Sequence, residues 1–251
     1  MARNLKFTLA YDGHDFHGWQ VQPELVTVQG LLSAALERIT GERVLPQGSG
    51  RTDAGVHALA QVASCAIESP IPAANLVIAL NDVLPPAIRI LAIEDAAPAF
   101  HARASARAKT YRYRIWRADI CPPFLARYVY HHPYPLDEAA MTAAAPLVCG
   151  QHDFTSFAAV DPERGREGEE TSNVRRVFSS SWQREREELV YSIRGDGFLH
   201  HMVRNLVGTF LLVGKGSLRP QDVSGILQAK NRSAAGPTAP ARGLYLVAVE
   251  Y

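Results

Sequence analysis

TYRYRIWR, residues 110–117, is a strand-like segment at which the chain begins its order of secondary-structure elements for a second time. Tyr111 and Tyr113 are interleaved with arginines, a two-residue period that is typical of a strand. An alanine-rich helix is expected next, near residues 137–148, and Pro146 should kink or shorten it. Two strands, a helix with one apolar stripe, a short extra helix and a final strand are then predicted near residues 174–184, 188–195, 199–213, 220–229 and 244–251.

The first half of the chain has the same predicted order. A strand is expected at residues 5–11, and a helix then begins after Thr27, which is a plausible N-cap. Its apolar residues have helical spacing, and they are Val28, Leu31, Leu32, Ala35, Leu36 and Ile39. Two strands, a helix that ends at Pro85 and Pro86, and another strand are predicted near residues 43–48, 58–68, 72–84 and 88–94.

Two successive β-α-β-β-α-β units predict an α+β protein built from two ferredoxin-like domains with antiparallel sheets. We expect the domains to comprise residues 1–104 and 105–251, joined around residues 100–110, with a central cleft where their sheets meet. Ligand sites favour such clefts. Residues 161–173 are charged and almost free of apolar side chains, so a mobile loop is expected there.

The composition is that of an ordinary folded protein, with 251 residues of which 47% are hydrophobic. No apolar run approaches the roughly 20 residues of a spanning helix, and no signal-peptide core is recognisable near the first residue, so a cytoplasmic protein is expected. The three cysteines lack the spacing of a zinc site and are interpreted as reduced structural thiols. The net charge of +1 gives no bulk argument for a polyanionic partner.

The distribution of charge is more informative, because one segment is basic and free of acids until Asp119. Its cationic residues are Arg103, Arg107, Lys109, Arg112, Arg114 and Arg117. This segment is a candidate phosphate-binding stripe, and the alternative is a solvated strand face. Tyr111 and Tyr113 within it favour RNA, and we take Arg107, Lys109, Arg112 and Arg114 as candidate contacts of the RNA backbone.

GSGRTDAGVHA, residues 48–58, has three glycines around a polar core, which indicates a tight loop or a close approach to a ligand. Its glycines fit neither the GxxxxGK(S/T) pattern nor the GxGxxG pattern of phosphate-binding loops. If residues 51–53 are extended, Arg51 and Asp53 project to the same side, and the guanidinium would keep the carboxylate ionised. Such a carboxylate can act as a nucleophile or general base. Alternatively, Asp53 closes a turn and Arg51 is its salt-bridge partner.

RTDAGVHA resembles the signature of the TruA family of tRNA pseudouridine synthases. Four further blocks resemble that family in order and spacing, FHGWQ (16–20) with Gln22, KTYRY (109–113), FLHHMVRNLVG (198–208) and PARGLYL (240–246). The resemblance extends through nearly the whole chain. It implies the pseudouridine synthase fold and the isomerisation of uridine to pseudouridine without a cofactor or a metal.

The resemblance also implies roles for individual residues. Asp53 would be the essential catalytic carboxylate, and Tyr111 would pack against a flipped target base. Arg204 would pair with Asp53, and Leu244 would form part of the wall of the uracil pocket. The alternatives are a core aromatic for Tyr111, a surface arginine for Arg204 and an ordinary strand residue for Leu244.

Roles outside the chemical reaction are expected for three histidines and for the block FHGWQ (16–20). His57, His200 and His201 are interpreted as structural or RNA-contacting, because this chemistry needs neither a metal nor an imidazole. Trp19 and Gln20 are expected to support the catalytic segment.

By resemblance, the substrate is uridine 38, 39 or 40 in the anticodon stem-loop of tRNA, and the active form is a homodimer. Two other classes of protein function are compatible with the sequence. One is an inactive RNA-binding module in which Asp53 is structural, and the other is a base-excising glycosidase, for which no second carboxylate lies near the motif.

Overall fold

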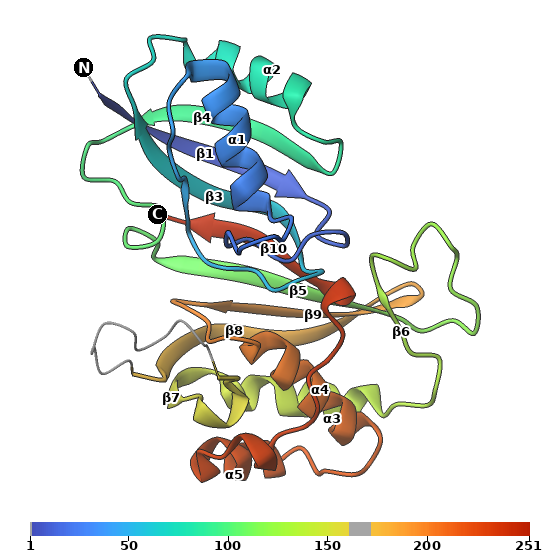
Figure 1. Ribbon diagram of the computed structural model, residues 1–251. Helices are drawn as coiled ribbons and strands as arrows, with labels where there is room; N and C mark the ends of the chain where they lie inside the picture. Colours follow the sequence, from blue (N-terminus) through green and yellow to red (C-terminus); the bar gives the residue numbers. More distant parts are fainter. Residues whose placement is uncertain (1, 161–171) are drawn as a thin grey trace. The chain divides into compact units, whose positions relative to one another are not determined.

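Every second residue of the strand β1 (Arg3–Tyr11) is buried, the pattern of a strand with one face against a core. Figure 1 shows the computed structural model, which describes residues 2–160 and 172–251. In it β1 pairs antiparallel with β3 (His57–Ile67) on one side and with β4 (Ile88–Ala96) on the other. The core of this first sheet includes the fully buried Leu5, Phe7 and Leu9.

Two strands share the other edge of β3. The very short β2 (Gln47–Gly48) pairs antiparallel with Ser64 and Ala63. The strand β10 (Leu244–Glu250) pairs in parallel with His57 and Ala58, at the beginning of β3. The strand predicted near residues 43–48 is therefore reduced to its last two residues, and β10 occupies the part of the edge that β2 leaves open.

Two helices lie beside each other in this first part of the chain (Figure 1). The helix α1 (Val28–Thr40) begins as predicted, because the Thr27 side chain accepts a hydrogen bond from the backbone of Gly30. Gly41 ends it in the left-handed conformation. The helix α2 (Ala73–Val83) stops at Leu84, which is extended as expected of a residue that precedes a proline.

Four further strands lie in the order β5, β9, β8, β7 among the described residues. The strands are β5 (Ala108–Trp116), β9 (Glu188–Gly195), β8 (Val174–Glu185) and β7 (Gly150–Asp153). The β8 strand pairs antiparallel with β7 and β9, and the short β6 (Tyr130–His131) pairs in parallel with β5.

The helices in this second part of the chain are α3 (Glu138–Ala144), α4 (Met202–Gly214) and α5 (Asp222–Ala229). Pro146 shortens α3 as predicted, and the chain continues as the 3-10 helix η1 (Ala145–Val148). Three further 3-10 turns are η2 (Thr155–Phe157), η3 (Arg232–Ala234) and η4 (Ala241–Gly243). The strands and helices together confirm the α+β class.

The chain divides into two compact units. Unit 1 comprises Met1–Lys109 and Tyr245–Tyr251, and unit 2 comprises Thr110–Leu244. The predicted division between residues 104 and 105 lies close to the first of these boundaries. The final strand was expected in the second domain, whereas most of β10 belongs to unit 1, because it pairs with β3.

Two predictions concern segments rather than domains. Most of the segment expected to be a mobile loop, residues 161–171, lies outside the described residues. Among the residues that are described, no helix has the length and apolar character needed to span a membrane.

Candidate active-site residues

The segment between β2 and β3 contains Arg51, Thr52 and Asp53 and has no regular secondary structure. Its turn is closed by a backbone bond in which Val56 donates to the main-chain oxygen of Asp53 at 3.1 Å. Gly55 has a φ of 77°, a conformation that favours glycine. Arg51 is exposed, Thr52 is buried and Asp53 is half-buried, so the fold places the predicted carboxylate at the surface of unit 1 on a tightly turned segment.

FHGWQ, residues 16–20, packs directly against this segment. The backbone of Trp19 donates to the carbonyl of Thr52 at 3.0 Å, and Gly55 donates to the carbonyl of Phe16 at 3.2 Å. A Cβ on Gly18 would lie 2.5 Å from the Thr52 oxygen, so only glycine permits this approach. Trp19 itself is buried. The structure thus gives Trp19 the supporting position that the sequence predicted.

A cluster of buried polar side chains lies against the same segment in unit 1. The Tyr11 hydroxyl is 2.8 Å from Thr52 Oγ1, and the Gln61 amide is bonded to Ser49 and Gly50. Lys109 Nζ donates to the carbonyl of Ser49 at 2.6 Å. Lys109 therefore supports the segment, whereas the sequence suggested only a contact with the RNA backbone.

His57, the last candidate in the motif, is buried at the start of β3. Its Nδ1 lies 3.1 Å from the backbone nitrogen of Gly13 and 3.1 Å from a carboxylate oxygen of Asp12. Its ring stacks on Tyr245 with centroids 4.8 Å apart. Of the two roles expected for His57, structural or RNA-contacting, these contacts agree with the structural one.

In unit 2, Tyr111 and Tyr113 point to the buried face of β5, and Arg112 to the exposed face. The Tyr111 ring packs edge-on against Phe198, with centroids 5.0 Å apart and an interplanar angle of 77°. The hydroxyl of Tyr113 donates to the carbonyl of Pro240 at 2.8 Å. Tyr113 is thereby tied into the core, and burial strongly raises the pKa of its hydroxyl.

Arg204 lies in the first turn of α4, where the segment before β10 holds it. Its Nε donates to the carbonyl of Ala239 at 2.8 Å, and the backbone of Ala239 donates to the carbonyl of Arg204 at 3.1 Å. Leu244, the first residue of β10, is buried in the structure. Arg204 is therefore bonded to the segment that leads into β10, the strand that begins with Leu244.

His200 and His201 directly precede α4. Nδ1 of His200 lies 3.0 Å from the carbonyl of Val160, and the two imidazole rings are 4.0 Å apart. His201 has a φ of 59° at the N-cap of α4, a conformation that is uncommon for residues other than glycine. Both histidines shape the start of the helix that carries Arg204.

The other candidate contacts of the RNA backbone differ in their surroundings. Arg107 and Arg112 are exposed. Arg114 makes two bonds with Glu188, from Nε at 2.7 Å and from Nη2 at 2.6 Å. A guanidinium held in a bidentate pair is less available to a phosphate, so Arg107 and Arg112 are the stronger candidates.

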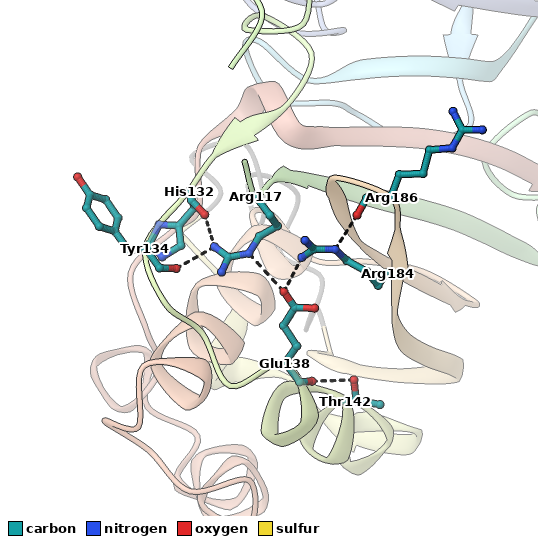
Figure 2. Close-up of polar contacts among 7 residues, drawn as sticks. All are labelled: Arg117, His132, Tyr134, Glu138, Thr142, Arg184 and Arg186. Atoms are coloured by element: carbon teal, nitrogen blue, oxygen red, sulfur yellow. Dashed lines mark hydrogen bonds and ion pairs between the residues drawn. The ribbon is translucent and has the colours of Figure 1, made fainter. Parts of the chain in front are cut away.

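Arg117, at the end of the basic segment, is also held by protein groups, as Figure 2 shows. Its guanidinium donates to the carbonyls of His132 and Tyr134 and to the carboxylate of Glu138 in α3. Arg184 of β8 donates to the same Glu138 oxygen at 2.6 Å. The side chain of Arg117 is 8% exposed, so it connects elements of unit 2.

Sequence reasoning gave no role to four residues that form the contacts described above: Tyr11, Ser49, Gln61 and Phe198. Gln61 left a signal, because it is a polar residue in the otherwise apolar beginning of β3. Tyr11 left none, since an aromatic residue at a buried strand position is indistinguishable from an ordinary core residue.

Comparisons with known proteins agree over nearly the entire chain. The sequence model of a family described as tRNA pseudouridine synthase matches residues 9–103 and 144–251. The tRNA pseudouridine synthase A of Solibacter usitatus is 53% identical over 249 residues, which are 99% of this chain and 100% of that protein. The proteins of the same name from Moorella thermoacetica and Brevibacillus brevis are 47% and 44% identical, each with 98% or more of both chains covered.

Proposed function

Because the chain belongs to the tRNA pseudouridine synthase family, we propose that it isomerises uridine to pseudouridine in tRNA, with Asp53 as the essential catalytic carboxylate. The observation that carries the proposal is the agreement with this family over nearly the full chain, which includes the Arg51-Thr52-Asp53 segment. The local structure supports it, because Asp53 is half-buried on a segment that several hydrogen bonds hold in place.

The proposed reaction breaks the bond between N1 of uracil and C1′ of ribose, turns the base, and joins C5 to the same sugar carbon. The proton on C5 is released and N1 gains one, so atoms and electrons balance without an oxidant or an energy donor. We therefore propose that the enzyme uses no cofactor and no metal. An ionised Asp53 can add to C6, attack C1′ or remove the 2′ proton, and each route needs a carboxylate beside the base.

Four other residues receive roles in the proposed active site, two that contact the uridine and two that act on Asp53. We propose that Tyr111 stacks on the flipped base, because its ring lies on a strand and is held edge-on by Phe198. Leu244 forms part of the apolar wall of the uracil pocket. Arg51 and Arg204 keep the Asp53 carboxylate ionised and oriented, as a guanidinium does for a nearby carboxylate.

The substrate and the assembly follow from the resemblance to the TruA family. We propose that uridines 38, 39 and 40 of the anticodon stem-loop are modified and that the active form is a homodimer in the cytoplasm. Arg107 and Arg112 are exposed and are the proposed contacts of the RNA backbone, and Lys109 and Arg114 are secondary candidates.

One assay separates this function from its rivals. The protein is incubated with tRNA that carries tritium at C5 of uracil. A synthase releases tritium and leaves the base on the RNA, a glycosidase frees uracil, and a binding module does neither. Mapping of the modified sites in the product then tests the assignment to positions 38, 39 and 40.

The role of Asp53 is tested by Asp53→Asn, which preserves size and removes the charge. We expect a loss of turnover of at least about a thousandfold, with tRNA binding retained, because an amide cannot act as nucleophile or base. Asp95→Asn is the matched control, since Asp95 is exposed at the end of β4 and pairs with Arg3. Substantial turnover by Asp53→Asn would contradict the proposal.

A further inference from the structure

We propose that Tyr11 and Gln61 are positioning residues that fix the backbone of residues 49–52 and thereby hold the Asp53 carboxylate in its reactive orientation. This inference rests on the proposed function, because it assigns the chemistry to Asp53. Tyr11 is 4% exposed and Gln61 is completely buried. Their influence on the reaction must therefore pass through the segment that they contact.

Gln61 holds the first part of the segment. Its Oε1 accepts a hydrogen bond from Ser49 Oγ at 2.7 Å, and its Nε2 donates to the carbonyl of Gly50 at 2.9 Å. The backbone of Ser49 donates in addition to the carbonyl of Val62 at 2.7 Å. A primary amide is suited to this task, because it offers an acceptor and two donors in one rigid plane.

Tyr11 holds the second part. Its hydroxyl is 2.8 Å from Thr52 Oγ1, and Thr52 directly precedes Asp53. Gln61 Nε2 donates to the Tyr11 oxygen at 3.4 Å, and either hydroxyl of the Tyr11–Thr52 pair can be the donor in the bond between them. The two side chains thus form one connected network that reaches residues on both sides of Arg51.

The network is buried, so breaking any of its hydrogen bonds strongly destabilises the fold. A buried donor or acceptor that loses its partner is destabilised by the full desolvation penalty, so the favoured conformation of the segment is the one in which all these bonds exist. Burial also raises the pKa of Tyr11 to about 12. The phenol is therefore neutral and able to donate throughout the working pH range.

Fixing the backbone next to a catalytic group affects rate more than binding. Displacement of a reacting group by about 1 Å can lower the rate by about a hundredfold, even when the altered residue is remote from the chemistry. Removal of the Tyr11 hydroxyl breaks the side-chain bond at Thr52, while the bonds at Ser49 and Gly50 and the bond from the Trp19 backbone to the Thr52 carbonyl remain. We expect kcat to fall and KM for tRNA to stay constant.

The test measures kcat and KM of Tyr11→Phe with tRNA labelled at C5 of uracil, alongside its thermal unfolding. We expect kcat to fall about tenfold or more with KM changed less than about twofold. Thr52→Val removes the other partner of the same bond and should have a similar effect. The double variant should be no worse than the more affected single variant, because both changes break one interaction.

Tyr191→Phe is the matched control. Tyr191 is fully buried in β9, and its hydroxyl lies 2.8 Å from Ser180 Oγ, the same type of bond at the same distance as in the Tyr11 pair. The two variants should lose similar stability. Only Tyr11→Phe should have a lower kcat than the wild type.

Two outcomes overturn the inference. One is a kcat of Tyr11→Phe equal to that of Tyr191→Phe, which would give Tyr11 a purely structural role. The other is a double variant in which the reductions in kcat caused by Tyr11→Phe and by Thr52→Val multiply. If Tyr11→Phe does not fold, Thr52→Val, which removes the other partner of the same bond, takes its place with the same expected loss of kcat. Asp53→Asn is assayed in parallel, and its residual turnover would refute the proposed function itself.

Discussion

Tyr111 and Tyr113 are two residues apart on the same face of β5, yet their surroundings assign them different tasks. The hydroxyl of Tyr113 donates to Pro240, and a Cβ on Gly243 would lie 2.8 Å from its ring. Tyr113 is therefore fixed at both its ring and its hydroxyl. The Tyr111 ring, which is also buried, has a different neighbour and packs edge-on against Phe198.

This difference gives a prediction for paired substitutions. Tyr111→Ala should lower kcat/KM about 5-fold to 150-fold, the equivalent of the 1–3 kcal/mol by which one aromatic ring stabilises a stacked base. Tyr111→Phe keeps the ring and should retain most activity. Tyr113→Phe should lower the free energy of unfolding by about 1 kcal/mol through its lost hydrogen bond and leave kcat unchanged. Equal activities of Tyr111→Ala and the wild type would exclude stacking by Tyr111.

His132 gives a prediction for the pH dependence of stability. Burial, with the positive charges of Lys215 and Arg117, lowers the pKa of its imidazole from 6.5 to about 4. The unfolded chain takes up a proton at this residue near pH 6.5 and the folded chain only near pH 4. The free energy of unfolding should therefore fall as the pH drops from about 6.5 to about 4, by roughly 2–3 kcal/mol from this residue.

The measurement is urea denaturation at several pH values for the wild type and His132→Gln. The difference between their slopes against pH isolates this histidine, whatever the absolute stability of the variant. Identical slopes would show that His132 is as easily protonated in the folded protein as in the unfolded chain.

At the scale of elements, α4 depends on the absence of a side chain at Gly208. A Cβ there would lie 1.6 Å from the carbonyl oxygen of Pro237, so the helix and the segment at residues 236–240 approach as closely as their backbones allow. The same segment bonds to Arg204 and to Thr209 of α4. The position of Arg204 therefore depends on a helix packed against a loop through a glycine.

Gly208→Ala should destabilise the protein by at least about 2 kcal/mol, because the backbone of Pro237 has to move. Gly225→Ala in α5 is the matched control, since nothing lies within 4 Å of a Cβ at that helical position. That substitution should stabilise the helix by about 0.5–1 kcal/mol. Thermal unfolding of both variants provides the measurement, and a neutral Gly208→Ala would contradict the close packing.

Prediction from sequence succeeded where elements are long and periodic. The helices α1 and α2 and the strands β3, β8 and β9 were expected within a few residues of their observed bounds, because most of them combine a recognisable apolar pattern with recognisable ends. The strand β7 was missed, since its four residues include a glycine and three polar side chains. Its pairing with β8 is a tertiary contact, to which local pattern is insensitive.

At the scale of the whole molecule, repetition of the β-α-β-β-α-β order predicted the α+β class. The same reasoning assigned the final strand to the second half because it comes last in the chain. Pairing of β10 with β3 depends on a neighbour nearly two hundred residues away, and no local signal encodes it. For the site, glycines and reactive groups revealed residues 48–58, whereas the supporting Tyr11 is of an ordinary type and was found only in three dimensions.

The pairing of β10 predicts the result of removing residues 245–251. Unit 1 would lose the strand beside His57 and Ala58, the stacking of Tyr245 on His57 and the buried Leu246. We expect faster hydrogen exchange at the beginning of β3 and loss of turnover, because β3 starts four residues after Asp53. Removal of Tyr251 alone is the control, and it should leave exchange at His57 and Ala58 unchanged.

This return of β10 also bears on the order in which the protein is made. The ribosome synthesises residues 1–109 first, but the strand that completes their sheet is translated only after all of unit 2 has been made. While unit 2 is being synthesised, part of the β3 edge of unit 1 is therefore unpaired. An unpaired strand edge favours association with other chains. Chaperones that act on nascent polypeptides should accordingly engage this protein until the last strand has left the exit tunnel.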